Sequence, residues 1–417
     1  MLEQHDTMTN IDSISNISNN APSGAALDTI ANNWAPPPEP PTKTRISKKS
    51  GTYRNLIHDM RRMAGKAIGK VKNVKGESVR NRTCKCGRVP LQLGGNNTVG
   101  VVKNEKGAYF TRLEHCGSVW SCPVCSHKIK EYRRSEIKAA LLNSHSLGYS
   151  ARFVTLTLAH HSFDRCETLI SNIIHSYSNV RGFGSCKRKR KKYGIVDIRS
   201  IEVTHGVNGW HPHIHLIILS KDKEGLKEYS EYIVEAWVRH CNNEGLKCSP
   251  DAQDNRKVYG KAGIASYVSK WDVTKEISSN SKNANSGHRT PFGILKDLVD
   301  GASKDEKIDY ALFREFSDAF KGVHSIEWRT ARKLFLSQKE EKTDLEIVIE
   351  EQNDIDIAEF DKAIFKEIVM KKAEAAIISK TIEKGVPGII ETLDLYSIFF
   401  YIKDREVPIP LFVHSPL

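Results

Sequence analysis

Five of the nine cysteines in this chain of 417 residues lie between positions 84 and 125, and this cluster limits the fold more than any other feature. They are spaced as Cys84-x-Cys86, Cys116 and Cys122-x-x-Cys125. A gap of two residues lets both thiolates of the last pair reach one tetrahedral ion, and Pro123 stiffens the chain between them. The sequence therefore predicts a small segment organised by a metal ion instead of by disulfides.

A structural Zn²⁺ ion needs four ligands, and this segment offers five cysteines together with His115 and His127. The expected ligands are Cys86, Cys116, Cys122 and Cys125. Cys84 is the main competitor, and a set of buried thiols without metal is the alternative. A site closed by four protein ligands would hold a zinc-ribbon-like segment together and perform no chemistry.

The N-terminal residues lack the basic start and apolar run of a secretory signal, and no stretch of about 18 apolar residues suits a membrane span. We therefore expect a cytoplasmic protein with no membrane partner. A reducing compartment also agrees with an odd number of cysteines.

Charge is distributed unevenly along the chain, whose formal net charge is +13. Residues 1–42 contain no lysine or arginine and several prolines, which predicts a disordered tail. Residues 43–83 form a basic arm, and residues 336–417 form an acidic region whose role the sequence does not indicate. A second basic run consists of Lys187, Arg188, Lys189, Arg190, Lys191 and Lys192. Such runs favour contacts with DNA phosphates, and a solvated loop is the alternative.

Hydrophobic periodicity predicts an α+β fold in which helices flank a central antiparallel sheet. Strands are expected at 98–102, 108–112, 152–158, 197–204 and 213–219. Helices are expected at 127–142, 166–180, 224–240, 261–271 and 306–320. The zinc-binding segment would cover residues 84–126 and the main domain residues 127–335.

The stretch from Trp210 to Ile218 contains three histidines in five positions, followed by apolar residues. Residues two apart on a strand share a face, so His213 and His215 are expected to point together while Ile214 points into the core. His211 has the same parity, but Pro212 leaves its direction open. Two imidazoles on one face predict a metal site.

The preceding strand offers a third ligand, Glu202, which has the opposite parity to Ile201 and Val203. If this strand pairs antiparallel with residues 213–219 across the glycine turn, the carboxylate reaches the same ion. Two imidazoles and a carboxylate with open positions suit Mg²⁺ or Mn²⁺, with zinc as the alternative metal. An exposed strand carboxylate without a metal is the alternative for Glu202.

Further along, Tyr267 and Lys270 are three residues apart, which places them on one face of a helix. A phenol becomes a nucleophile when neighbouring positive charge compensates its phenolate. Because Tyr-x-x-Lys pairs are common, this pair indicates a nucleophilic site only in combination with the histidine pair.

Taken together, these residues resemble the HUH endonuclease superfamily, specifically the single-tyrosine initiators of plasmid rolling-circle replication. Phe153–Leu158 resembles the first motif of that family, His211–His215 the second and Ala265–Lys270 the third, in the family's order. Trp120–Cys125 is similar to a cysteine segment found upstream in the plasmid proteins. The resemblance covers about residues 84–335.

The resemblance implies an enzyme that nicks single-stranded or extruded origin DNA. Glu202, His213 and His215 would hold the catalytic ion, and Tyr267 would attack the scissile phosphate to leave a 5′-phosphotyrosine and a free 3′-OH. Lys270 would neutralise the developing charge. A host polymerase would extend the 3′-OH, and a host helicase would be needed because the chain has no Gly-x-x-x-x-Gly-Lys motif.

One position departs from the family pattern. Several members carry a glutamate four residues before the tyrosine, where this chain has Gly263. Asp272, Glu276 and Tyr259 are the candidates to replace it in termination. Two other functional classes remain: an HUH transposase or conjugative relaxase, and a zinc-bearing DNA-binding protein that cuts nothing.

Overall fold

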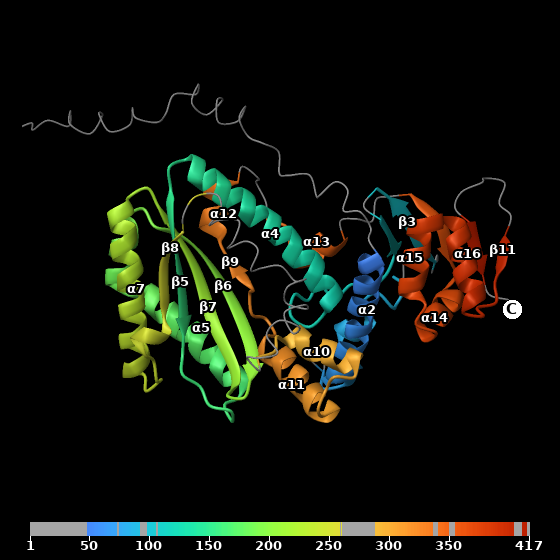
Figure 1. The fold of residues 1–417 in the computed structure, drawn as a ribbon, viewed down its shortest axis with the longest axis horizontal. Coiled ribbons are helices and arrows are strands. Elements are labelled where there is room, and N and C mark those ends of the chain that lie inside the picture. The colour runs from blue at the N-terminus through green and yellow to red at the C-terminus, as the bar shows by residue number, and fades with distance from the viewer. Residues whose placement is uncertain are drawn as a thin grey trace, which may run out of the picture. The chain divides into compact units, whose positions relative to one another are not determined.

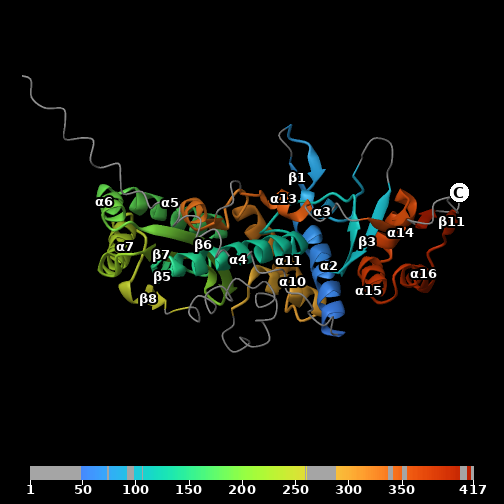
Figure 2. The same ribbon diagram turned by 90° about the horizontal axis from the view of Figure 1, so that it is seen from above.

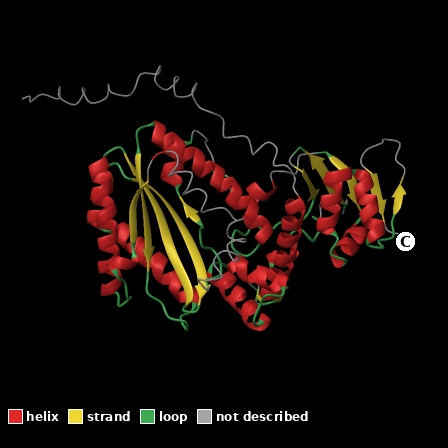
Figure 3. Cartoon of the chain, viewed as in Figure 1, coloured by secondary structure: helices red, strands yellow, loops and turns green. Residues whose placement is uncertain are grey.

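The computed structural model describes residues 48–72, 75–91, 98–105, 107–258, 260, 288–336, 341–349, 355–403 and 411–414. The tail expected over residues 1–42 and the helix expected over 261–271 lie outside these ranges. Within them, helices pack on two five-stranded sheets (Figure 3), and two further strands pair with each other as a separate ribbon. The expected α+β class with antiparallel sheet pairing is therefore confirmed.

The central sheet has the strand order β8-β5-β7-β6-β9, and all its neighbouring strands are antiparallel. Its strands are β5 (Ser150–Thr157), β6 (Val196–Gly206), β7 (Gly209–Ser220), β8 (Asp254–Val258) and β9 (Ile326–Glu327). β6 and β7 form a hairpin that closes at the pair of Gly206 and Gly209. Gly209 has a φ of 82°, which a residue with a side chain rarely adopts. This pairing across the glycine turn confirms the prediction.

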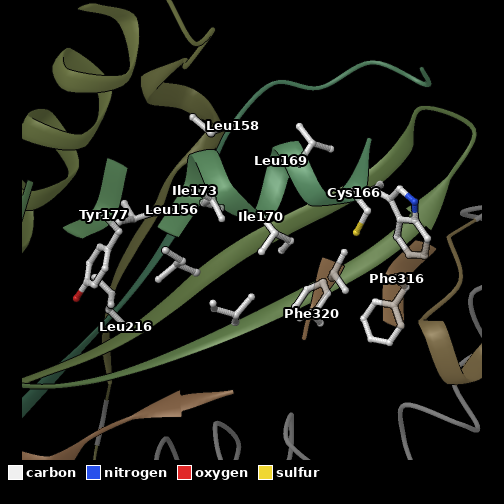
Figure 4. Close-up of a cluster of buried hydrophobic side chains, with 14 of the residues drawn as sticks. Leu156, Leu158, Cys166, Leu169, Ile170, Ile173, Tyr177, Leu216, Phe316 and Phe320 are labelled. Atoms are coloured by element: carbon white, nitrogen blue, oxygen red, sulfur yellow. The ribbon is translucent and has the colours of Figure 1, made fainter. Parts of the chain in front are cut away.

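One face of the central sheet packs against α5 (Cys166–Gly182) and α7 (Lys223–Asn243). Leu156 and Leu216 point to this face because side chains alternate between the two faces along each strand. α5 presents Ile170 and Ile173 to them at helical spacing, as Figure 4 shows. Both helices were expected from the sequence, and both are confirmed.

The opposite face packs against α4 (Pro123–Ser146) and α12 (Arg329–Phe335). Phe153, Ile198 and Ile217 supply the strand side of this core. Between the two helices, the buried carboxylate of Glu136 on α4 accepts a hydrogen bond from Nη2 of Arg332 on α12 at 3.1 Å, which fixes α12 on α4. These contacts cover the end of the face away from the glycine turn.

A second sheet joins the hairpin of the cysteine segment to the C-terminal region, in the order β11-β12-β10-β3-β4. Its strands are β3 (Val99–Asn104), β4 (Gly107–Thr111), β10 (Asp356–Phe360), β11 (Tyr401–Lys403) and β12 (Leu411–His414). The expected β3–β4 hairpin is confirmed, and β10 pairs antiparallel with β3. α14 (Lys362–Met370), α15 (Glu374–Lys384) and α16 (Val386–Leu395) pack on this sheet (Figure 2). The acidic region thus forms a core together with the β3–β4 hairpin, which the sequence reasoning missed.

Part of the basic arm is a helix, α2 (Lys48–Ile68), which lies beside α10 and α11 (Figure 1). Its Met60, Ala64 and Ile68 are buried in the main core. The remaining elements are β1 (Lys70–Lys72), β2 (Ser78–Arg80), α3 (Arg82–Lys85), α6 (Gly184–Lys192), η1 (Pro250–Ala252), α10 (Pro291–Asp300), α11 (Glu306–Ala319) and α13 (Asp344–Ile349). Among the described residues, none of the helices has the length and apolar character needed to cross a membrane.

Candidate metal centre

The β6–β7 hairpin brings Glu202 and two histidines to one place on the central sheet. Glu202 lies opposite His213 in the strand register, and Ser200 lies opposite His215. The two histidines point the same way because residues two apart on a strand share a face. Ile214 between them points to the other face and is fully buried in the core under α5 and α7.

One carboxylate oxygen lies between the two imidazoles. Oε2 of Glu202 is 2.8 Å from Nε2 of His215 and 3.4 Å from Nε2 of His213. The ligand atoms of the three residues all lie within 4.8 Å of one another. Glu202 keeps 53 % of its side-chain surface exposed, so the carboxylate side of the cluster is open to solvent. Three ligands with open coordination positions suit an ion that acts on a substrate.

Thr155 on β5 orients one of the imidazoles. It lies opposite His215, and its Oγ1 is 3.1 Å from Nδ1 of that ring. When Nδ1 donates to this hydroxyl, the lone pair of Nε2 faces the cluster and is available to a metal. Phe153 stacks on the same ring, with centroids 5.2 Å apart, and holds it from the side.

His211 continues the row of rings and so shares the face of the other two, which the sequence left open. Its ring centroid is 5.4 Å from that of His213, and its Nε2 is 3.0 Å from Oγ1 of Thr157. Burial, together with the neighbouring His213 and His160, lowers the pKa of His211 to about 4. His211 is therefore neutral at physiological pH, and it lies beside the three-ligand cluster without joining it.

The electrostatics of the cluster favour a cation. Crowding by protein atoms opposes the ionisation of Glu202, but hydrogen bonds and charge from His213 and His215 lower its pKa well below its usual range. The side chain is thus a carboxylate at neutral pH, beside two imidazoles whose Nε2 atoms face it. This donor set fits Mn²⁺ or Mg²⁺, and it also fits Zn²⁺.

The turn end of the hairpin is fixed by residues far away in the sequence. Nε1 of Trp210 donates to Glu315 of α11 at 3.1 Å, and the other oxygen of Glu315 accepts from the backbone of Cys166 at 2.9 Å. His205 and Arg289 pair through their backbones, with both N–H···O distances at 2.8 Å. These contacts hold the ligands of the hairpin in place because they lock the strands that carry them.

The four expected zinc ligands gather in a separate buried cluster consisting of Cys86, Cys116, Cys122 and Cys125. The sulfur of Cys86 is 3.4 Å from that of Cys125 and 3.6 Å from that of Cys122, and Cys116 is 3.7 Å from Cys125. Four sulfurs bound at about 2.3 Å to one tetrahedral ion lie about 3.8 Å apart, so the arrangement fits Zn²⁺ closely. Hydrogen bonds among the thiols lower the pKa of Cys86 and Cys116 and raise the pKa of Cys122 and Cys125.

Cys84 lies apart from this cluster. Its thiol donates to the backbone carbonyls of Gly65 at 3.2 Å and Gly69 at 3.4 Å. Ile347 and Val348 of α13, which belong to the C-terminal part of the chain, pack on the four thiols. The cluster therefore links parts of the chain that are distant in sequence, in keeping with a structural role.

The basic run at 187–192 lies in α6, and its side chains have different surroundings. Arg190 donates from Nη2 to the buried Asp197 at 3.0 Å, which ties α6 to β6. Lys189 pairs with Glu228, and Lys192 donates to the hydroxyl of Tyr193 at 2.9 Å. The other three members, Lys187, Arg188 and Lys191, are exposed.

Tyr267 and Lys270 lie outside the described residues, as do Tyr259 and Gly263. The flanks of that segment are attached to the central sheet. On one side, β8 pairs with β5, and on the other the backbone of Arg289 pairs with that of His205.

Sequence reasoning missed the supporting residues. Thr155 and Thr157 alternate with leucines on β5, and this pattern was the available signal for two polar side chains facing the histidines. No local pattern indicates Glu315, because its partner Trp210 is more than eighty residues away in sequence.

Two curated proteins are similar to this chain. Protein rep of Streptomyces lividans is 27 % identical over 283 residues, which cover 52 % of this chain and 62 % of that protein. A neomycin resistance protein of Streptomyces cyanogenus is 31 % identical over 133 residues, which cover 26 % of this chain and 30 % of that protein. The chain thus spans less than two thirds of either relative. No protein-family model and no solved structure matches it.

Proposed function

We propose that this protein initiates plasmid replication by nicking one strand of origin DNA, with Glu202, His213 and His215 holding a divalent ion and Tyr267 as the nucleophile. The cluster on the β6–β7 hairpin carries this proposal, because its three ligand atoms converge beside an exposed carboxylate. The similarity to a protein named rep supports a role in replication, and DNA is then the partner.

The residues have distinct roles in the proposed reaction. When bound, Mn²⁺ or Mg²⁺ would polarise an oxygen of the scissile phosphate. The phenolic oxygen of Tyr267 forms a bond to phosphorus while the bond from phosphorus to the 3′ oxygen breaks. The phenol gives up its proton, and the 3′ oxygen gains one to become the 3′-OH. Lys270 compensates charge near the phenolate.

The remaining parts of the chain support this step. Thr155 sets the orientation of the His215 ring, and the four cysteines hold a structural Zn²⁺ ion away from the reaction. Exposed lysines and arginines contact phosphates of the DNA. A host helicase separates the strands, and a host polymerase extends the 3′-OH.

The test is to incubate the protein with a pool of labelled single-stranded oligonucleotides, in Mn²⁺ or in EDTA. We expect a covalent protein–DNA adduct in Mn²⁺ and none in EDTA. His213→Ala should bind DNA like the wild type and form no adduct, because basic residues supply the binding. His145→Ala, at an exposed histidine of α4, is the matched control and should form the adduct normally.

The possible outcomes separate the functional classes. Tight DNA binding without any adduct would contradict nicking and favour a zinc-bearing protein that binds DNA without cutting it. If an adduct forms, mapping the nick on plasmid DNA separates a replication initiator from a transposase or a relaxase. A nick at the plasmid's own origin supports the initiator.

A further inference from the structure

A cavity of about 260 Å³ opens on the face of the central sheet that α5 covers. Its polar lining includes Ser178, Arg181, Lys187, Arg199 and Glu327. Arg199 and Glu202 are three residues apart on β6, so their side chains leave the strand on opposite faces. The cavity is therefore separate from the metal cluster.

Arg199 is the unusual member of this lining, because it is a buried guanidinium with unused donors. Its side chain is 6 % exposed. Nη2 is 2.7 Å from Oε1 of Glu327 and 3.5 Å from the carbonyl of His324. Nε and Nη1 are buried and have no hydrogen-bond partner among the described residues. A buried donor without a partner costs about 1–3 kcal/mol, so a ligand that accepts these bonds would bind favourably.

The charges around the cavity leave an excess of positive charge. Asp197 is shared by two arginines, since Nη2 of Arg181 and Nη2 of Arg190 both lie within 3.1 Å of its Oδ1. Among the described residues, Glu327 forms an ion pair with Arg199. Lys187 lines the cavity, is exposed, and has no recorded ion pair within the described part of the chain. Two carboxylates thus face four cationic side chains.

We propose that this cavity binds a phosphate group of the DNA strand, with Arg199 donating from Nε and Nη1 and with Arg181 and Lys187 at its rim. A guanidinium matches the geometry of a phosphate because its planar donors engage two oxygens at once. The hydroxyl of Ser178 supplies one further donor.

DNA is the expected source of the phosphate, and this part of the proposal rests on the proposed function. Lys187 begins the basic run of α6, whose exposed members Arg188 and Lys191 extend positive charge away from the cavity. Nucleic-acid backbones follow such stripes of positive charge. A DNA strand on α6 would therefore place successive phosphates at the cavity and along the helix.

The test measures binding of a labelled single-stranded oligonucleotide at several salt concentrations, with no Mn²⁺ or Mg²⁺ added so that nicking plays no part and the structural zinc is kept. The variants are Lys187→Gln, Arg199→Gln and the control Lys304→Gln, which changes an exposed lysine between α10 and α11. We expect both cavity variants to bind several-fold more weakly. Each should lower the slope of log affinity against log salt by about 0.7, the value for one phosphate contact on a single strand. Lys304→Gln should bind like the wild type.

A second arm titrates inorganic phosphate and follows the thermal unfolding temperature of the full chain. Phosphate should raise that temperature in the wild type and less in Lys187→Gln, a surface change that leaves the fold intact even if Arg199→Gln does not fold. If phosphate stabilises the wild type while Lys187→Gln and Arg199→Gln bind DNA as the wild type does, DNA is not the source of the phosphate. Equal responses of Lys187→Gln and Lys304→Gln in both arms would overturn the cavity as a phosphate site. A wild-type chain that binds no DNA contradicts the proposed function, while the phosphate arm still tests the cavity.

Discussion

Oε2 of Glu202 lies 2.8 Å from Nε2 of His215, although the two residues are thirteen positions apart in sequence. The antiparallel register of β6 and β7 produces this contact, because it sets Glu202 opposite His213 and diagonal to His215. A slip of one residue in that register would turn the carboxylate to the other face of the sheet. The glycine turn and the anchored ends of the hairpin hold the register.

Replacing Glu202 by glutamine tests whether this carboxylate is a ligand. Glu202→Gln keeps the size of the side chain and removes its negative charge, so we expect Mn²⁺ affinity to fall at least tenfold and adduct formation to fall with it. Calorimetric titration with Mn²⁺ measures the first effect. Glu235→Gln, at an exposed carboxylate of α7, should change neither. Equal Mn²⁺ affinity in both variants would show that Glu202 does not bind the ion.

Thr155→Val tests the role of the hydroxyl that orients His215. Valine keeps the branched shape, so the strand should stay intact and the unfolding temperature should change little. Loss of the partner at Nδ1 should lower metal affinity by about 10- to 100-fold. Adduct formation at saturating Mn²⁺ should recover, because Thr155 positions a ligand and touches no substrate. Unchanged metal affinity in Thr155→Val would show that this hydroxyl does not orient His215 for metal binding.

The four-cysteine cluster predicts one tightly bound zinc ion per chain. Cys122→Ser removes one ligand, so we expect zinc loss and a fall in the unfolding temperature, since closed metal sites contribute directly to folding. Cys84→Ser is the matched control and should keep its zinc, because that thiol contacts the carbonyls of Gly65 and Gly69. Metal analysis of both purified variants decides the matter. Wild-type protein without zinc would refute the site.

Asp197 predicts a pH-dependent contribution to stability. Burial opposes its ionisation, but hydrogen bonds and charge from Arg190 and Arg181 lower its pKa below the usual value. Because the folded pKa is the lower one, this stabilisation is present above the unfolded pKa of about 3.9 and is lost as pH falls through the folded value. Asp197→Asn should therefore cost about 3 kcal/mol at pH 7 and progressively less below about pH 4.

Denaturant unfolding of the wild type and of Asp197→Asn at several pH values measures this difference. Asp251→Asn changes an exposed carboxylate of η1 and serves as the control. If the free energies of unfolding of the wild type and Asp197→Asn differ by the same amount down to pH 3, the negative charge of Asp197 is not the source of the stabilisation.

Tyr267→Phe should bind DNA and Mn²⁺ normally and form no covalent adduct, because only the phenolic oxygen is lost. Tyr259→Phe is the matched control and should form the adduct. Peptide mass spectrometry of the trapped wild-type adduct locates the nucleotide. A nucleotide on the peptide that contains Tyr259 would transfer the role of nucleophile to that residue.

Local sequence patterns determined much of this protein. The alternation around Ile214 placed His213 and His215 on one face, and the helical spacing of apolar residues predicted α5 and α7. These predictions succeed because strand and helix periodicities follow from backbone geometry within a few residues. The cysteine spacing likewise selected the four thiols that the fold brings together.

Tertiary structure decided the rest, because it depends on which distant segments pack together. Cys84 has the same chemistry as Cys86, and only the packing of α2 turns its thiol away from the cluster. Arg190 belongs to a basic run in the sequence, yet in the fold its guanidinium donates a hydrogen bond to Asp197. β10 completes a sheet with β3, although about 250 residues separate them. A sequence pattern reports which face a residue occupies, whereas its partner is set by the free energy of packing the whole chain.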